Sequence, residues 1–206
     1  ESDVSDSCQR LLMEFGKIDV LINNATNDPK VEAIQNGMNF SRLENFDLKL
    51  WEHDISVGLT GAFLCSKYFG YAIAKNDHGG AIINVSSDLG LIAPDQQLYL
   101  KEGVEESQQT VKPVTYSVVK TGLIGLTKYL ATYWAEKNVR CNAICPGGVF
   151  NDQLSDEFLK KIYERIPLKR MANIDEYKGA IVFLASDEAS YMNGTILSMD
   201  GGRTVW

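Results

Sequence analysis

The chain has 206 residues, of which 45% are hydrophobic and 23% are charged. This length and composition predict one globular domain over residues 1–206 and exclude disordered and fibrous proteins. The 27 acidic and 20 basic residues leave a net charge of −7. Because such a surface repels phosphate backbones and anionic lipid, we expect neither nucleic-acid binding nor membrane binding as the main function.

The sequence also bears on location and on metal binding. It has no run of the roughly 20 apolar residues that a membrane helix needs, and no basic and apolar leader at its start. Cys141 and Cys145 lie on one expected strand, about 13 Å apart and too far for a disulfide. His53 and His78 have no partner at metal-ligand spacing. We expect a reduced, cytoplasmic protein without a metal site.

Apolar strands and helices alternate along the chain. The predicted elements, in order, are helix 5–15, strand 18–22, helix 46–75, strand 81–85, helix 115–136, strand 139–145, helices 155–165 and 174–185, and strand 195–199. Gly16 suits the end of the first helix, and Asn173 with Glu176 has the capping-box spacing. Buried strands alternating with helices predict an α/β fold with a doubly wound, Rossmann-like parallel sheet.

Ligands of such sheets bind beyond the carboxyl ends of the strands. One helix near those ends carries Tyr116 and Lys120, one turn or about 6 Å apart. A neighbouring ammonium favours the phenolate and lowers the pKa of a tyrosine, which can then exchange a proton with a substrate hydroxyl or carbonyl. The spacing alone is weak evidence, because Tyr71 with Lys75 and Tyr133 with Lys137 share it. Tyr116 differs because it lies between strands that end in polar or turn residues.

Several motifs in a fixed order make the chain resemble the short-chain dehydrogenase/reductase family, in its single-domain branch. They are Asp3-Val4-Ser5-Asp6, 18–25 (IDVLINNA), 82–87 (IINVSS), Tyr116 with Lys120, 142–147 (NAICPG), 183–187 (FLASD) and Asp200-Gly201-Gly202. Together they cover nearly the whole chain. The resemblance implies an oxidoreductase that uses NAD or NADP and a small-molecule substrate. It also implies a homodimer or homotetramer that packs through its long helices.

The resemblance assigns roles residue by residue. Tyr116 is the general acid/base, Lys120 lowers its pKa and binds the nicotinamide ribose, and Ser87 orients the reacting carbonyl or hydroxyl. Cofactor contacts are expected from Asp3 and Val4 at the adenine, Asn24 and Ala25 at the adenosine ribose, and Pro146, Gly147 and Val149 at the nicotinamide. Asn23 is expected to tie adjacent strands together.

The chain departs from the family pattern in several places. The family's first strand, its Gly-rich phosphate-binding turn and the next strand have no counterpart, so we expect a sheet that lacks its N-terminal strands. We expect the chain to be part of a longer protein, with a naturally truncated protein as the less favoured alternative, because truncation would expose one side of the sheet. Gly58 stands where the family has Asn, Thr26 where it has Gly, and Asn151 where it has Thr. We expect the substitution Gly58→Asn to be tolerated and to change the rate less than about tenfold.

Two expanded segments accompany these departures. Ser87 and Tyr116 are 29 residues apart, longer than the family norm, and the extra residues form the 94–113 segment. The 27–45 segment is also expanded and amide-rich. A loop beside the reacting centre is expected to form a substrate wall, with an exposed ornament as the alternative. Its polar content suits a polar substrate, such as a sugar or nucleotide sugar.

The leading hypothesis is therefore an NAD(P)-dependent oxidoreductase acting on a polar alcohol or carbonyl. A non-catalytic binding or scaffold protein that keeps the fold is the alternative. Gly58 and the missing N-terminal strands favour that alternative, whereas Ser87, Tyr116 and Lys120 oppose it. A sugar-nucleotide epimerase or dehydratase would share the Tyr/Lys pair, but the short C-terminal region argues against the larger substrate domain of those enzymes.

Overall fold

A computed structural model of the chain describes residues 1–27, 34–35 and 38–205. Its central feature is a four-stranded sheet in the order β1-β4-β5-β6, and all the strand pairs are parallel. The strands are β1 (Val20–Asn23), β4 (Gly80–Val85), β5 (Val139–Pro146) and β6 (Ile196–Met199). The predicted parallel α/β sheet is confirmed, and each predicted strand overlaps an observed one.

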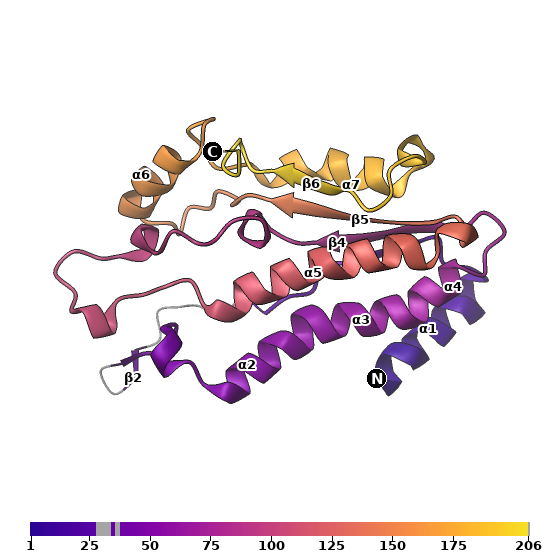
Figure 1. Cartoon of the computed structure of the whole chain (residues 1–206), viewed down its shortest axis with the longest axis horizontal. Helices are drawn as coiled ribbons and strands as arrows, with labels where there is room; N and C mark the ends of the chain where they lie inside the picture. The colour runs from indigo at the N-terminus through magenta and orange to yellow at the C-terminus, as the bar shows by residue number, and fades with distance from the viewer. Residues whose placement is uncertain (28–33, 36–37, 206) are drawn as a thin grey trace.

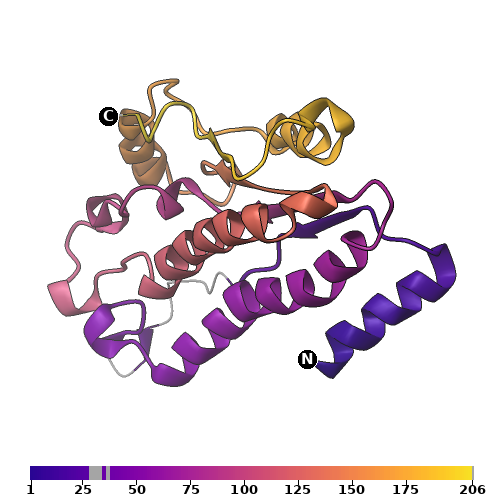
Figure 2. The same ribbon diagram turned by 45° about the vertical axis from the view of Figure 1, so that its right-hand side comes forward.

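Helices cover both faces of the sheet (Figures 1 and 2). They are α1 (Ser2–Phe15), α2 (Leu48–Ile55), α3 (Gly61–Cys65), α4 (Tyr71–Ile73), α5 (Val114–Tyr133), α6 (Asp156–Arg165) and α7 (Lys178–Ala185). The row α2–α4 and α5 lie on one side of the sheet, and α7 lies on the other. In the part of the chain that the structure describes, no helix has both the length and the apolar character needed to cross a membrane.

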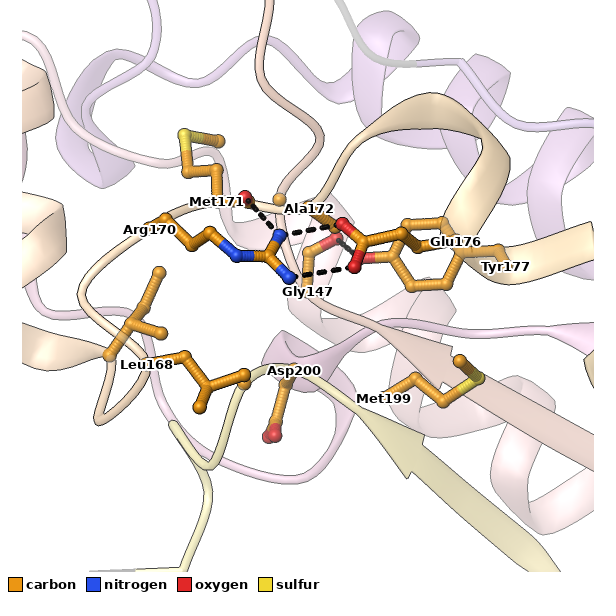
Figure 3. Close-up of a pocket in the computed structure, with 12 residues that line it drawn as sticks. Gly147, Leu168, Arg170, Met171, Ala172, Glu176, Tyr177, Met199 and Asp200 are labelled. Atoms are coloured by element: carbon orange, nitrogen blue, oxygen red, sulfur yellow. Dashed lines mark hydrogen bonds and ion pairs between the residues drawn. The ribbon is translucent and has the colours of Figure 1, made fainter.

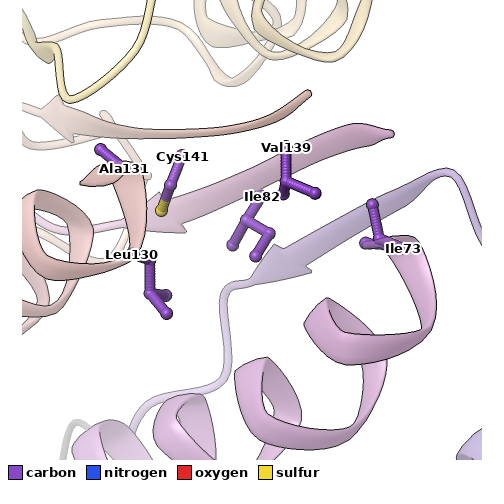
Figure 4. Close-up of a cluster of buried hydrophobic side chains, with 6 residues drawn as sticks. All are labelled: Ile73, Ile82, Leu130, Ala131, Val139 and Cys141. Carbon is purple, nitrogen blue, oxygen red and sulfur yellow. The ribbon is translucent and has the colours of Figure 1, made fainter. Parts of the chain in front are cut away.

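The central strands β4 and β5 are apolar on both faces because each face packs against helices, whereas Val20 and Ile22 of the edge strand β1 are exposed. Ile82 and Ile83 are neighbours on β4, and both are 0% exposed. Ile82 packs with Ile73 of α4, Leu130 of α5 and residues of β5 in the cluster shown in Figure 4. Ile83 points to the opposite face and packs with Leu184 of α7. This alternation explains the continuous apolar run in the sequence, as expected for a doubly covered parallel sheet.

The long helix predicted over 46–75 is observed as α2, α3 and α4, joined by π-helical turns at Ser56–Thr60 and Ser66–Gly70. The Asp47 side chain caps its start by accepting a hydrogen bond of 2.8 Å from the Lys49 amide. A π turn accommodates an extra residue in a helix and often occurs near functional sites. Gly58 lies in the first π turn, and it is buried.

Two predicted helix signals are confirmed, with shifted boundaries. Gly16 ends α1 in the left-handed conformation, with φ 77°, but the helix begins at Ser2 instead of residue 5. Asn173 and Glu176 form the predicted capping box, in which the Asn173 amide donates to the Glu176 carboxylate at 2.7 Å. The first turn after Asn173 is a 3-10 helix, and α7 begins only at Lys178.

The first part of the 94–113 segment packs onto α6, whereas residues 101–103 and 105–107 are exposed. Leu98 is only 3% exposed and forms a cluster with Ile162, Ile166 and Met171. A 3.0 Å ion pair between Asp95 and Arg165 joins the same two elements. The segment also meets the other expansion, because the Val111 amide donates to the Ser41 hydroxyl at 3.0 Å. Part of the predicted 27–45 expansion lies outside the described residues, and its described part includes a short hairpin of β2 (Ile34–Gln35) and β3 (Met38–Asn39).

Candidate active site

The two serines at the end of β4 have different partners. Ser86 is 2% exposed, and its hydroxyl donates to the backbone carbonyl of Lys120 at 2.7 Å, which ties β4 to α5. Ser87 is 4% exposed and accepts a hydrogen bond of 3.2 Å from the Leu89 amide, which caps a 3-10 turn. Ser86 is thus a structural link. Ser87 lies at the carboxyl end of β4, where a ligand of a parallel sheet is expected.

Helix α5 carries both Tyr116 and Lys120, and it packs against β4 close to the two serines. Lys120 is 4% exposed, and its ammonium donates to the carbonyl of Val85 at 2.9 Å, one residue before the serines. The Lys120 ammonium lies 5.7 Å from the centre of the Tyr116 ring, and the ammonium of Lys112 lies 3.7 Å from it. Two ammonium groups thus contact the ring of Tyr116. The ammonium of Lys120 is thereby fixed between the end of β4 and the predicted acid/base.

The other two Tyr/Lys pairs have a different environment. Tyr71 is 56% exposed, with the Lys75 ammonium 4.9 Å from its ring centre. Tyr133 is 60% exposed and stacks on Tyr129 at 5.5 Å between ring centres. Neither tyrosine lies at a strand end. The burial of the lysine, and not the sequence spacing, therefore distinguishes the pair of Tyr116.

The end of β1 confirms one predicted role and leaves others as predictions. The Asn23 amide donates to Asn84 at 2.8 Å and to Ser66 at 3.2 Å, so Asn23 ties β1 to β4 and to the long helix. Asn24 and Ala25 follow it in an exposed loop at the carboxyl end of β1. Asp3 and Val4, predicted at the adenine, lie in the first turn of α1. The cofactor contacts of these four residues stay predictions.

Pro146 is the last residue of β5, and the predicted nicotinamide contacts follow it. The Gly147 amide donates to the Met199 carbonyl at 2.9 Å, and a Cβ at this glycine would lie 2.9 Å from the Cα of Asp200. Gly147 is therefore required by the close approach of the two chain segments. Val149 is 36% exposed and bridges to Ala172. Pro146, Gly147 and Val149 lie at the exit from β5, and their contact with the nicotinamide stays a prediction.

A cavity of about 180 Å³ lies between the ends of β5 and β6 (Figure 3). Across it, the Arg170 guanidinium holds the Glu176 carboxylate with two hydrogen bonds of 2.6 and 2.7 Å, and these bonds lower the pKa of Glu176 to about 2. Tyr177 donates to the Gly147 carbonyl at 2.9 Å. Burial, together with the nearby carboxylates, raises the pKa of Tyr177 to about 12, so this phenol stays protonated. Tyr177 in the wall of this cavity thus holds Gly147 in place. Ser87, Tyr116 and Lys120 do not line the cavity.

Packing opposes the expectation that Gly58→Asn would be tolerated, and its expected effect on the rate stays a prediction. A Cβ at Gly58 would lie 2.5 Å from Cγ1 of Val119, which is itself only 3% exposed. Valine is branched at Cβ and cannot turn its methyl groups away easily. The absence of a side chain at Gly58 therefore allows the π turn to pack closely against Val119 of α5, the residue directly before Lys120.

Sequence reasoning missed two buried acidic residues near the site. Asp54 is 2% exposed and accepts hydrogen bonds from Thr115 at 2.5 Å and from Asn27 at 2.6 Å, so it positions the residue before Tyr116. Asp88 is 3% exposed and pairs with Arg203 at 2.6 Å. No sequence pattern marks either residue as buried, because Thr115 and Arg203, which bond to Asp54 and Asp88, lie far away in the chain.

Comparisons with known proteins agree with this geometry. The sequence profile of a family described as Enoyl-(Acyl carrier protein) reductase matches residues 1–204. An uncharacterized oxidoreductase of Thermotoga maritima is 33% identical, over 98% of this chain and 74% of the relative. The 2-dehydro-3-deoxy-D-gluconate 5-dehydrogenase of Dickeya dadantii is 29% identical, over 98% of this chain and 72% of the relative. A gluconate 5-dehydrogenase of Burkholderia cenocepacia, solved with NADP and tartrate, is 25% identical with a TM-score of 0.82, over 100% of this chain and 72% of its own. The chain therefore belongs to the short-chain dehydrogenase/reductase family of oxidoreductases.

Proposed function

We propose that the protein transfers a hydride between NAD or NADP and a polar alcohol or carbonyl, with a sugar or sugar-derived acid as substrate. The observation that carries the proposal is the buried Lys120 ammonium, fixed by the Val85 carbonyl 2.9 Å away and 5.7 Å from the Tyr116 ring centre. Burying a cation is costly, so a site that holds one beside a phenol favours a chemical role over a structural one.

The described residues fit a nicotinamide dinucleotide. The exposed loop of Asn24 and Ala25 and the strand exit at Gly147 lie at carboxyl ends of parallel strands, where such ligands bind. NAD or NADP, when bound, supplies the hydride chemistry. Tyr116 takes the proton from the substrate hydroxyl in oxidation and returns it to the carbonyl oxygen in reduction. Lys120 keeps a positive charge beside that proton, and Ser87 contacts the substrate.

Two observations favour a polyhydroxylated substrate over an acyl chain. The relatives from Dickeya dadantii and Burkholderia cenocepacia are named for gluconate-type substrates. The 94–113 segment, which adjoins Tyr116, carries the exposed Gln97, whose amide suits a hydroxyl group, whereas the amides of Gln96 and Gln109 bond to the backbone of the segment itself. An acyl substrate, suggested by the name of the family profile, is the second candidate.

The experiment is a turnover assay of the protein expressed from its whole gene, followed by nicotinamide absorbance. Gluconate, D-glucose and D-threitol are compared with an acyl-carrier thioester, each with NAD(H) and NADP(H). Turnover of a polyol supports the proposal, and turnover of the thioester alone supports the second candidate. Cofactor binding without turnover of any substrate would favour a scaffold that keeps the fold.

We also propose a homo-oligomer. Tyr129 and Tyr133 on α5 are both 60% exposed and stack on each other, and Phe63 on α3 is 51% exposed. Aromatic residues of this kind are enriched in subunit interfaces. Light scattering of the same protein should give a dimer or tetramer mass, and the substitutions Tyr129→Glu and Tyr133→Glu together should lower it.

A further inference from the structure

Lys112 places a second ammonium group against Tyr116, in addition to that of Lys120. Its Nζ atom lies 3.7 Å from the centre of the Tyr116 ring, compared with 5.7 Å for Nζ of Lys120. A separation below about 6 Å is typical of a cation over the face of an aromatic ring. Lys120 belongs to α5 and donates to the Val85 carbonyl, whereas Lys112 belongs to the 94–113 segment. That segment therefore supplies a cation of its own at the proposed acid/base.

The backbone of Lys112 is fixed by both expanded segments. The Gln96 side chain accepts a hydrogen bond of 2.8 Å from the Lys112 amide, and its own amide donates to the Lys112 carbonyl at 3.5 Å. The preceding Val111 amide donates to the Ser41 hydroxyl at 3.0 Å. Pro113 follows, and a residue before proline is confined to an extended backbone. The base of the lysine side chain is thereby held in place beside the start of α5.

Positive charge exceeds negative charge among the ionisable side chains described around the end of β4 and the start of α5. The carboxylate of Asp88 is paired with Arg203 at 2.6 Å. Asp54 accepts its hydrogen bonds from neutral side chains. With Lys112 and Lys120, these groups are three cations and two carboxylates, so one positive charge is left over on a chain whose net charge is −7. A local excess of positive charge attracts small anions.

A lysine ammonium suits an anion in this position. It carries three N–H donors, so it can contact the ring of Tyr116 and an anion at once. Hydrogen bonds from an ammonium to carboxylate or phosphate oxygens are about twice as strong as neutral ones. The predicted contacts of Pro146 and Gly147 bring the nicotinamide, which carries no negative charge, to this end of the site. The anionic group therefore belongs to the substrate.

We propose that Lys112 is a specificity-determining residue that binds a carboxylate or phosphate group of the substrate beside Tyr116. The protein thereby selects anionic sugar derivatives over neutral sugars and polyols. The inference rests on the proposed function and narrows its substrate class. It concerns a residue outside the set of Ser87, Tyr116 and Lys120, on the segment that exceeds the family norm in length.

Ligand binding tests the inference without turnover. Calorimetry uses the whole protein with saturating NAD or NADP and two matched pairs of probes, D-gluconate against D-glucitol and D-glucose 6-phosphate against D-glucose. The members of each pair differ mainly in the anionic group. We expect one anion or both to bind about tenfold more tightly than the neutral counterpart, as a hydrogen bond between charged groups provides. A preference in the first pair assigns a carboxylate, and a preference in the second assigns a phosphate.

Equal affinity within both pairs, or binding of neither anion, would overturn the inference. Neither result would contradict turnover of a neutral polyol in the assay above, which tests the proposed function separately.

Substitutions then show whether the Lys112 ammonium makes the difference. Lys112→Met removes the charge at similar length and should weaken binding of the preferred anion about tenfold, with the neutral counterpart unchanged within about threefold. Lys112→Arg keeps a cation and should retain most of the preference. Lys75→Met is the matched control, because the Lys75 ammonium lies 4.9 Å from the ring centre of the exposed Tyr71.

A thermal melt of each variant separates loss of fold from loss of selectivity, and Lys112→Gln takes the place of Lys112→Met if the latter does not fold. A folded, uncharged variant that keeps the wild-type preference, or that binds anion and neutral counterpart equally less well, would show that Lys112 only braces Tyr116.

Discussion

The ends of β4 and β5 and the 94–113 segment lie next to each other, but they are held in different ways. At the strand ends, Ser86 and Lys120 bond to backbone groups of regular elements and are almost completely buried. The 94–113 segment contains only short 3-10 turns. It is held by side chains that bond to its own backbone, such as Gln109 to the Lys101 carbonyl at 2.8 Å, and by one apolar cluster around Leu98.

This difference separates the proposed chemistry from the proposed specificity. Groups that move a proton must stay in fixed geometry, and regular elements provide that geometry. A substrate wall must differ between relatives, and a segment fastened at a few points can change without disturbing the sheet. Four predictions test how completely the two regions are separated.

The largest effect is expected at the strand ends. Tyr116→Phe keeps the ring but removes the exchangeable proton, so turnover should fall by about 10²–10⁴-fold while cofactor affinity stays nearly unchanged. Steady-state kinetics and a cofactor titration measure the two. Tyr71→Phe is the matched control, since Tyr71 has the same spacing to a lysine but is exposed. Wild-type turnover by Tyr116→Phe would contradict the proposed proton transfer by Tyr116.

In the 94–113 segment, Leu98→Ala should lower the free energy of unfolding by about 2–5 kcal/mol, because it leaves a cavity against α6. Its effect on turnover should appear mainly in KM, since the strand ends do not depend on Leu98. Chemical denaturation and kinetics test both points. Leu43→Ala, at a leucine that is 71% exposed, is the control and should change stability by less than about 0.5 kcal/mol. A fall in kcat as large as the rise in KM would show that the two regions are coupled.

The substitution Gly58→Asn tests how rigidly the first π turn packs against α5 beside Lys120. The new side chain would overlap Val119, so we expect a loss of about 1–3 kcal/mol in the free energy of unfolding. Adding Val119→Ala makes room and should restore part of that loss. Denaturation curves of the single and double variants give both values. Full stability of Gly58→Asn with Val119 unchanged would show that the π turn shifts freely.

The smallest effect is expected where Arg170 and Glu176 brace Met171, which packs against Leu98. The pKa of Glu176 is lowered to about 2 from 4.5 by its bonds to Arg170 and the Asn173 amide. A lowered folded-state pKa adds stability above pH 4.5 that is lost as the pH falls toward 2. Glu176→Gln should therefore flatten the acid limb of the stability curve. An unchanged slope between those pH values would contradict the assignment.

Much of the fold was predictable from sequence because its strands are uniformly apolar and separated by clear helix signals. The strand predicted over 81–85 is Gly80–Val85, and that predicted over 139–145 is Val139–Pro146. The π turns of the long helix were not predictable, because they arise where Gly58 and Gly70 pack against Val119 and Trp134 from distant parts of the chain. The helix propensities of neighbouring residues do not depend on such long-range contacts, so they cannot predict the π turns.

For the site, sequence motifs predicted the residues and tertiary contacts decided their partners. Ser87, Tyr116 and Lys120 could be named because their spacing and order match a family. The roles of Asp88 and Arg203 could not, because a turn after β6 brings the arginine back to β4 and no spacing rule links the two positions. The packing of Leu98 was hidden for the same reason, since a segment rich in amides and charges gave no periodic pattern.

The pairing of Asp88 with Arg203 also has a consequence for how the molecule is made. The two residues are 115 positions apart in the chain, and at ribosomal speeds of about 5–20 residues per second roughly 6–23 s separate their synthesis. Until the arginine emerges, the carboxylate has no cation to offset its burial, so the turn after β4 stays hydrated. On the ribosome, strands β1, β4 and β5 can therefore pair before the environment of Ser87 is complete.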